Sequence, residues 1–219
     1  MKSFKLILFE KIVVKCTNYI DRLQGLDFLT VIQSEDVGLD PKLSHWSSPS
    51  GDKYLKSLFT DMNITEKDLI IDVGCGKGSA MRTMLKFPFE RVDGIEISDI
   101  IVTIAKRNFK RLKKIRGNVF NANALFFNEY DGYNFVYFYN PFPQIVMKQV
   151  ITFLIESIQR SDRELIIIYN NSKCSDVIIN NTIFKKIGFY PSRNKNKISI
   201  YSNFTITKSR LKMNKLMYS

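Results

Sequence analysis

The chain has 219 residues, of which 45% are hydrophobic and 25% charged, and its 33 Lys and Arg outnumber 21 Asp and Glu to give a formal net charge of +12. This balance is typical of a globular protein with one sizeable core, and it excludes collagen-like, coiled-coil and disordered chains. No apolar run approaches the roughly 18 residues that a membrane-spanning helix needs, so we expect no membrane span.

The cysteine and histidine content limits the chemistry. The three cysteines, Cys16, Cys75 and Cys174, are odd in number and far apart, and His45 is the one histidine. This pattern favours a reducing, cytoplasmic location over a disulfide framework. A zinc site of the usual Cys/His kind would lack ligands, so we expect no metal.

The positive charge has two interpretations. An anionic partner such as nucleic acid or a phosphorylated sugar would explain it. The abundance of Lys, Ile, Asn, Phe and Tyr beside a single Trp is also what an AT-rich coding sequence gives. The densest basic run, residues 106–116, has one aromatic residue within it, so we interpret it as a solvated helix face. A nucleic-acid partner is therefore an alternative that the composition does not favour.

The first 52 residues are predicted to be an extension. Residues 1–23 place Phe4, Leu8 and Ile12 at helical spacing between lysines, which indicates an amphipathic helix. We expect this helix to pack on the domain or to pair with a second copy in a homodimer. Residues 25–50 are polar and loop-like, and this loop could fold over the active site as a lid with His45 and Trp46 touching the substrate.

Strands and helices alternate from residue 69 onward. The predicted strands are 69–73, 91–97, 118–123, 135–139 and 164–169, followed by a hairpin of 189–191 with 197–207. The predicted helices are 53–62, 79–86, 100–116, 144–160 and 174–187. This order predicts an α/β fold with a doubly wound, mostly parallel sheet. We expect one domain at 53–208 and a basic tail at 209–219.

A glycine-rich turn follows the first of these strands. Residues 72–78 read DVGCGKG and open the next helix, so their backbone N–H groups can approach a ligand closely. A dehydrogenase fingerprint would have its third glycine one position later, where the chain has Ser79. Glu96 stands at the end of the next strand, where a carboxylate can accept two hydrogen bonds from ribose hydroxyls.

These residues resemble the class I S-adenosylmethionine-dependent methyltransferases. The likeness rests on DVGCGKG at 72–78, GIE at 94–96 and NPF at 140–142, and it covers residues 68–202. It implies a seven-stranded Rossmann-like sheet with S-adenosyl-L-methionine as cofactor. A narrower resemblance, through residues 21–27 and 46–49, is to uncharacterised bacterial methyltransferases with a similar glycine turn and NPF loop.

The resemblance also implies roles for individual residues. Asp72 would organise the loop and the methionine amine, Glu96 would hold the ribose and Ile97 would flank the adenine. Asn123 stands where many relatives have an Asp that accepts from the adenine amino group, and an amide oxygen is a neutral substitute. The full set of cofactor-binding candidates is Asp72, Gly74, Cys75, Gly76, Gly78, Glu96, Ile97, Asn123, Ala124 and Asn140.

The loop after the strand 135–139 is the candidate acceptor site. Methyltransferases that act on amino groups have Asn/Asp-Pro-Pro-aromatic here, whereas this chain has Phe142 in place of the second proline. An alternative is that Asn140 only caps the following helix. The catalytic candidates are Asn140, Tyr139 and His45, and the substrate-binding candidates are Trp46, Pro141 and Phe142.

The sequence thus predicts methyl transfer from S-adenosylmethionine to an unidentified acceptor, which could be a small molecule, a glycan, or a protein amine or hydroxyl. Two alternatives stay open. The first is an RNA or DNA methyltransferase, favoured by the charge and by Asn140-Pro141. The second is a non-catalytic cofactor-binding protein on the same fold, suggested by Asn123 and the irregular loop.

Overall fold

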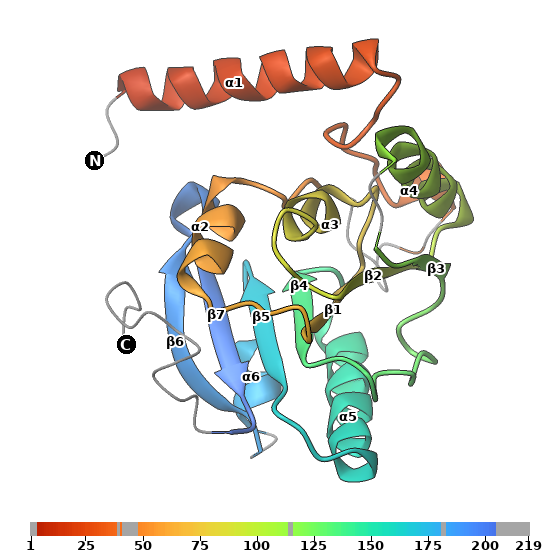
Figure 1. Ribbon diagram of the computed structural model, residues 1–219, viewed down its shortest axis with the longest axis vertical. Coiled ribbons are helices and arrows are strands. Elements are labelled where there is room, and N and C mark those ends of the chain that lie inside the picture. The colour runs from red at the N-terminus through yellow and green to blue at the C-terminus, as the bar shows by residue number, and fades with distance from the viewer. Residues whose placement is uncertain (1–3, 39, 41–47, 114–115, 181–182, 205–219) are drawn as a thin grey trace.

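The computed structural model describes residues 4–38, 40, 48–113, 116–180 and 183–204, with only the backbone for residues 4–11 and 194 (Figure 1). Seven strands form one sheet in the order β3-β2-β1-β4-β5-β7-β6. The strands are β1 (Leu69–Val73), β2 (Arg91–Glu96), β3 (Val119–Asn121), β4 (Phe135–Tyr139), β5 (Ile166–Asn170), β6 (Lys185–Pro191) and β7 (Lys197–Ser202).

The first five strands are parallel, and β7 runs antiparallel to both β5 and β6. The order reverses beside β1, so a crevice opens at the carboxyl ends of β1 and β4, where open α/β sheets bind ligands. The predicted α/β fold with a mostly parallel seven-stranded sheet is therefore confirmed.

Helices cover both faces of the sheet (Figure 1). They are α1 (Phe4–Leu23), α2 (Lys53–Asp61), α3 (Ser79–Met84), α4 (Asp99–Leu112), α5 (Gln144–Arg160) and α6 (Ser175–Ile179), with short 3₁₀ turns at Glu35–Val37 and Arg193–Lys195. Side chains alternate across β1: Ile70 joins the core under α2, α3 and α4, whereas Ile71 and Val73 join the core under α5 and α6. Among the described residues, no helix has the length and apolar character needed to cross a membrane.

The helix predicted over 174–187 is wrong in its second half. Helix α6 ends at Ile179, and β6 begins at Lys185 and pairs with β7. The apolar residues Ile183, Phe184 and Ile187 fit both a helical and a strand period, so the pattern alone did not separate them. Residues 185–191 form a strand because they pair with β7, and a contact of this kind cannot be inferred from local periodicity.

Helix α1 does not pack on the domain where its side chains are described. It crosses the top of the view apart from the sheet (Figure 1), and Ile12, Tyr19 and Ile20 are 49%, 65% and 52% exposed. Only at its end does it attach: Asp21 is buried and its carboxylate lies 2.8 Å from Arg82 of α3. Over these residues, the expected packing on the domain is not found.

Removing residues 1–15 should consequently leave the domain as stable as before. Exposed side chains contribute little to the free energy of unfolding, so the melting temperature should move by less than about 2 °C. Differential scanning calorimetry of the truncated and full chains measures this. A melting temperature lower by several degrees would mean that α1 packs against another surface. The first candidate for that surface is a second copy of the chain, which a measurement of oligomeric state would test.

Candidate active site

The glycine turn lies between β1 and α3, and its geometry requires glycine. Gly74 and Gly78 have φ of +79° and +86°, values that L side chains rarely adopt. A Cβ on Gly74 would also lie 2.5 Å from Cβ of Pro141, and one on Gly78 would lie 2.5 Å from the ring of Phe109. The turn is therefore pressed between the loop after β4 on one side and helix α4 on the other.

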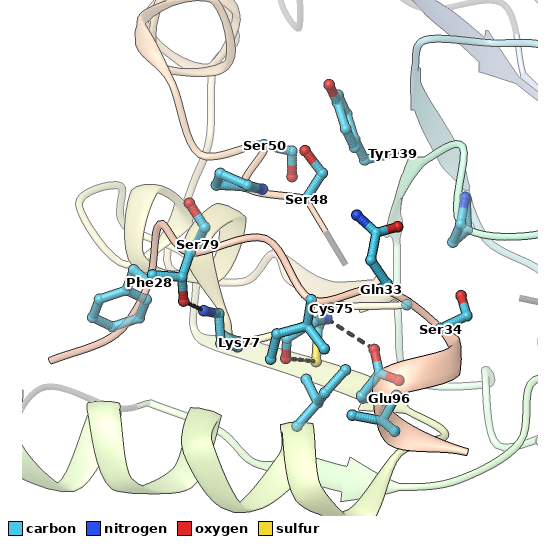
Figure 2. Close-up of a pocket in the computed structure, with 18 residues that line it drawn as sticks. Phe28, Gln33, Ser34, Ser48, Ser50, Cys75, Lys77, Ser79, Glu96 and Tyr139 are labelled. Atoms are coloured by element: carbon cyan, nitrogen blue, oxygen red, sulfur yellow. Dashed lines mark hydrogen bonds between the residues drawn. The ribbon is translucent and has the colours of Figure 1, made fainter. Parts of the chain in front are cut away.

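Glu96, the last residue of β2, faces this turn. Its carboxylate accepts one hydrogen bond from the Gly76 N–H, at 3.1 Å (Figure 2). It accepts a second from the Ser98 N–H, also at 3.1 Å. The side chain is only 8% exposed, and burial raises the pKa of Glu96 against the opposing effect of these hydrogen bonds. The two backbone donors fix the carboxylate at the edge of the hollow described next.

A hollow opens above the turn at the carboxyl ends of the strands. Figure 2 shows Glu96, Cys75 and Lys77 on one side of it, and Ser48, Ser50 and Tyr139 on the other. Residues from the N-terminal extension cover it. The lining consists of Phe28, Thr30, Ile32, Gln33, Ser34, Val37, Ser48, Pro49, Ser50, Gly74, Cys75, Gly76, Lys77, Ser79, Glu96, Ile101, Tyr139 and Pro141.

Asp72 lies in β1 below the turn and does not line the hollow. It is 2% exposed, and burial first, then the charge of Glu96, raises the pKa of Asp72 well above its ordinary value. Two buried carboxylates whose ionised forms disfavour each other create a site that favours a positively charged group nearby. The same carboxylates would repel a ligand with anionic phosphates.

Cys75 behaves as a small residue of the turn. It is buried, its thiol donates to the Gly76 carbonyl at 3.6 Å, and burial raises the pKa of the thiol well above its ordinary value. A thiol that resists ionisation is a poor nucleophile. The neighbouring Gly94 has no room for a side chain, since a Cβ there would lie 2.7 Å from that of Cys75.

The adenine candidates lie outside the hollow. The side-chain oxygen of Asn123 accepts from the Leu125 N–H at 2.9 Å and so closes a local turn. Ala124 packs on the core beneath α5, and Ile97 is 38% exposed on the surface beyond Glu96. Ile101 of α4, which the sequence reasoning did not single out, lines the hollow.

The loop after β4 approaches the turn through Pro141, and Asn140 is not among the residues that line the hollow. Asn140 has a φ of +42°, and its side-chain oxygen accepts from the Tyr169 hydroxyl at 3.3 Å. The N-cap of α5 is Pro143, without a side-chain cap bond, so Asn140 does not cap the helix. Phe142 is buried in the core, 6.1 Å from Phe138 between ring centroids, and is not part of the hollow's wall.

The side of the hollow formed by residues 48–50 and Tyr139 is fixed by contacts that the sequence did not predict. Arg193, between β6 and β7, lies 2.6 Å from the Asp52 carboxylate and donates to the Pro49 carbonyl at 3.4 Å. This places residues 48–52 beside Tyr139, where burial raises the pKa of the phenol and the Arg193 charge opposes it. His45 and Trp46 lie outside the described residues. Among the described residues, no cluster of three or more His, Cys, Asp or Glu side chains could hold a metal ion.

Comparison with known proteins agrees with this geometry. Residues 70–161 match the model of a family described as a methyltransferase domain. They include β1, the glycine turn, β2 with Glu96, and the loop after β4. This part of the chain is therefore similar to a methyltransferase domain. No curated protein matches the sequence.

Solved structures share the fold of the methyltransferase domain at low sequence identity. A SAM-dependent methyltransferase from Aquifex aeolicus is 12% identical with a TM-score of 0.53, over 68% of this chain and 88% of that one. An RNA methyltransferase from Salinibacter ruber, in complex with S-adenosyl-L-homocysteine, is 14% identical with a TM-score of 0.55, over 74% and 98%. Magnesium protoporphyrin IX methyltransferase from Synechocystis PCC 6803, with bound SAM, is 19% identical with a TM-score of 0.51, over 68% and 74%.

Proposed function

We propose that this methyltransferase takes its methyl group from S-adenosylmethionine and transfers it to an amine. The observation that carries the proposal is the Glu96 carboxylate, fixed by two backbone N–H groups at the edge of the hollow beside the glycine turn. Two of the structures with the same fold hold S-adenosylmethionine or its demethylated product. We also propose, from the sequence alone, that the chain is related to the uncharacterised bacterial methyltransferases with a similar glycine turn and NPF loop.

The residues present fit this cofactor. Gly74 has no Cβ, which lets Pro141 pack against the turn, and both residues line the hollow. Glu96 would accept from the ribose hydroxyls, and the buried negative charge of Asp72 and Glu96 would favour the cationic methionine end. When bound, the cofactor supplies an electrophilic methyl group on a sulfonium. NAD, with its two phosphates, would be disfavoured by the same carboxylates.

The loop after β4 and the covering residues would form the acceptor pocket. In-line methyl transfer requires mainly alignment and an available lone pair. We propose that Tyr139 and Asn140 orient an amine at this loop. Tyr139, Pro141 and residues 48–50 line the hollow there, and Asn140 would reach the amine from its position between Tyr139 and Pro141. His45 and Trp46, next in sequence to residues 48–50, would complete the acceptor side, and His45 would act as base if the acceptor is a hydroxyl. In this arrangement residues 1–52 are an extension of one helix and a covering loop, and residues 53–208 are the catalytic domain.

The acceptor class is tested with S-adenosylmethionine that carries a radiolabelled methyl group. The purified enzyme is incubated with separate pools of primary amines, proteins with exposed lysines, RNA, DNA, glycans and phenols. Incorporation into an amine pool supports the proposal. Incorporation only into hydroxyl compounds contradicts the amine assignment while leaving the methyl donor intact. The absence of turnover in every pool, with cofactor bound, would favour the non-catalytic alternative.

The affinity for the cofactor should depend on pH. Because burial raises the pKa of Asp72 and of Glu96 in the free protein, their charge is lost at a higher pH than for exposed carboxyls. The affinity for S-adenosylhomocysteine should therefore fall as the pH is lowered from neutral towards 4.5, the ordinary value for a glutamate. Calorimetric titrations at several pH values measure this, and a flat profile over that range would contradict the assigned role of the carboxylates.

Nucleic acid is a second candidate acceptor, and one surface observation favours it. Lys106, Arg107 and Lys110 are exposed on α4. On the neighbouring helices, burial and the charges of Arg82 and Lys56 lower the pKa of Lys86, which indicates that basic groups gather there. Binding of a short RNA should then weaken steeply with salt, since released counterions drive such binding. If the affinity for RNA does not change with salt concentration, this basic surface does not bind the phosphates of RNA.

A further inference from the structure

Residues 24–37, here called the strap, follow α1, end with the 3₁₀ turn Glu35–Val37 and contribute to the lining of the hollow. Thr30, Gln33 and Ser34 of the strap line the hollow. Figure 2 shows Gln33 and Ser34 beside Cys75 and Glu96. The preceding helix α1 contributes no such cover, because its described side chains up to Ile20 are largely solvent-exposed. The position of the strap must therefore be set by its contacts with the domain.

The main contact is an ion pair with the glycine turn itself, in which the Lys77 side chain is buried and the Asp27 side chain is 28% exposed. Lys77, which lies between Gly76 and Gly78, is 3% exposed, and its Nζ lies 2.6 Å from Oδ1 of Asp27. The same ammonium donates to Oγ1 of Thr30, and the Thr30 hydroxyl donates to Asp27. Burial would raise the pKa of Asp27, but the bonds from Lys77 and Thr30 together hold it below its ordinary value.

One side chain of α4 joins the strap and the turn a second time. Asn108 is fully buried; its oxygen accepts from the Asp27 N–H at 2.9 Å, and its amide donates to the Asp27 carbonyl at 2.8 Å and to the Lys77 carbonyl at 3.2 Å. The Arg111 guanidinium donates to the Gly25 carbonyl at 2.5 Å. The strap and the glycine turn are thus fixed relative to each other at both backbone and side chain.

We propose that Lys77 is a positioning residue for the cofactor, which latches the strap over the site through Asp27 and Thr30. A buried ion pair contributes little net stability compared with apolar packing, whereas removing one partner from it is costly. The Lys77 ammonium binds the strap. The backbone of the glycine turn therefore stays available to a ligand, while the Lys77 side chain holds the strap in place. This inference rests on the proposed binding of S-adenosylmethionine in the hollow.

The test compares two disruptions of ion pairs in the same region. Asp27→Asn and Lys77→Met break the latch, whereas Asp21→Asn breaks the neighbouring pair with Arg82, which lies outside the hollow. S-adenosylhomocysteine binding is measured by calorimetry, and hydrogen exchange is measured over residues 24–37. Each latch variant should bind at least about tenfold more weakly and exchange faster in the strap, while Asp21→Asn should bind within about twofold of wild type.

The affinity of the double variant Asp27→Asn/Lys77→Met distinguishes a latch from a merely structural role. Because both changes remove one interaction, the double variant should bind about as well as either single variant, and the losses should not add. A merely structural role would lower the melting temperatures of Asp21→Asn and Asp27→Asn alike and leave their affinities equal.

Each remaining outcome decides a separate claim. If the wild-type protein does not bind S-adenosylhomocysteine, the proposed function fails. If it binds and the latch variants match it within about twofold, the latch is wrong and the function stands. Where Lys77→Met does not fold, Thr30→Val removes a single hydroxyl of the latch, and unchanged binding by that variant overturns the proposal.

Discussion

Replacing Glu96 by Gln is expected to weaken the binding of S-adenosylmethionine at least about tenfold, because two hydrogen bonds to a charged acceptor contribute roughly 1.5–3 kcal/mol each and Gln retains only part of them. Gln has nearly the same shape and can still accept from one of the two N–H groups, of Gly76 and Ser98, that hold the carboxylate. Calorimetric titration of the variant and the wild type gives the two dissociation constants.

Glu90→Gln is the matched control for this change. Glu90 is an exposed glutamate just before β2, outside the hollow. Its substitution should leave the affinity unchanged. If Glu96→Gln binds as tightly as Glu90→Gln, the ribose is not held by this carboxylate, and the assignment of the cofactor site loses its principal residue.

The second large effect is expected at Asn140. If its side chain orients the acceptor, the interaction is made mainly in the transition state, so its loss lowers turnover more than binding. Asn140→Ala should bind S-adenosylmethionine nearly as well as the wild type and transfer methyl at least about ten times more slowly. The rate is measured with the acceptor identified from the labelled pools, and the affinity by calorimetry.

Asn140→Gly separates the side chain from the backbone. Asn140 has a φ of +42°, which Ala tolerates poorly and Gly adopts freely. Both variants lose the bond from the Tyr169 hydroxyl, so both should be slow if the side chain matters. A slow Ala variant beside a Gly variant of wild-type rate would assign the effect to backbone strain and would contradict the orienting role.

The sequence predicted best those elements that are set by local pattern. The bounds of β1, β4 and α5 agree with the structure to the residue. Continuous β-branched and aromatic runs bounded by glycine and proline leave few alternatives. The glycine turn was equally readable, because its spacing encodes the backbone geometry that Gly74 and Gly78 adopt.

The parts that were not predicted depend on distant contacts. The ion pairs Lys77–Asp27 and Arg193–Asp52 join segments far apart in the chain, and no local pattern indicates such partners. Phe142 was expected at the pocket because it follows Asn140-Pro141, yet the turn of the chain at Asn140 directs it into the core beside Phe138. The loop 25–50 was expected to cover the site, but its contacts were expected at His45 and Trp46, which lie outside the described residues. The described residues that line the hollow from this loop belong to the strap and to 48–50.

The central claim is that the hollow between the glycine turn, Glu96 and the strap binds S-adenosylmethionine, and calorimetric titration of the unmodified protein tests it most directly. We expect S-adenosylhomocysteine to bind at one site per chain with a dissociation constant on the order of micromolar, and NAD to give no binding heat, since the buried carboxylates of Asp72 and Glu96 oppose its phosphates. The account would be contradicted by binding of NAD, or by a titration in which S-adenosylhomocysteine produces no heat at all.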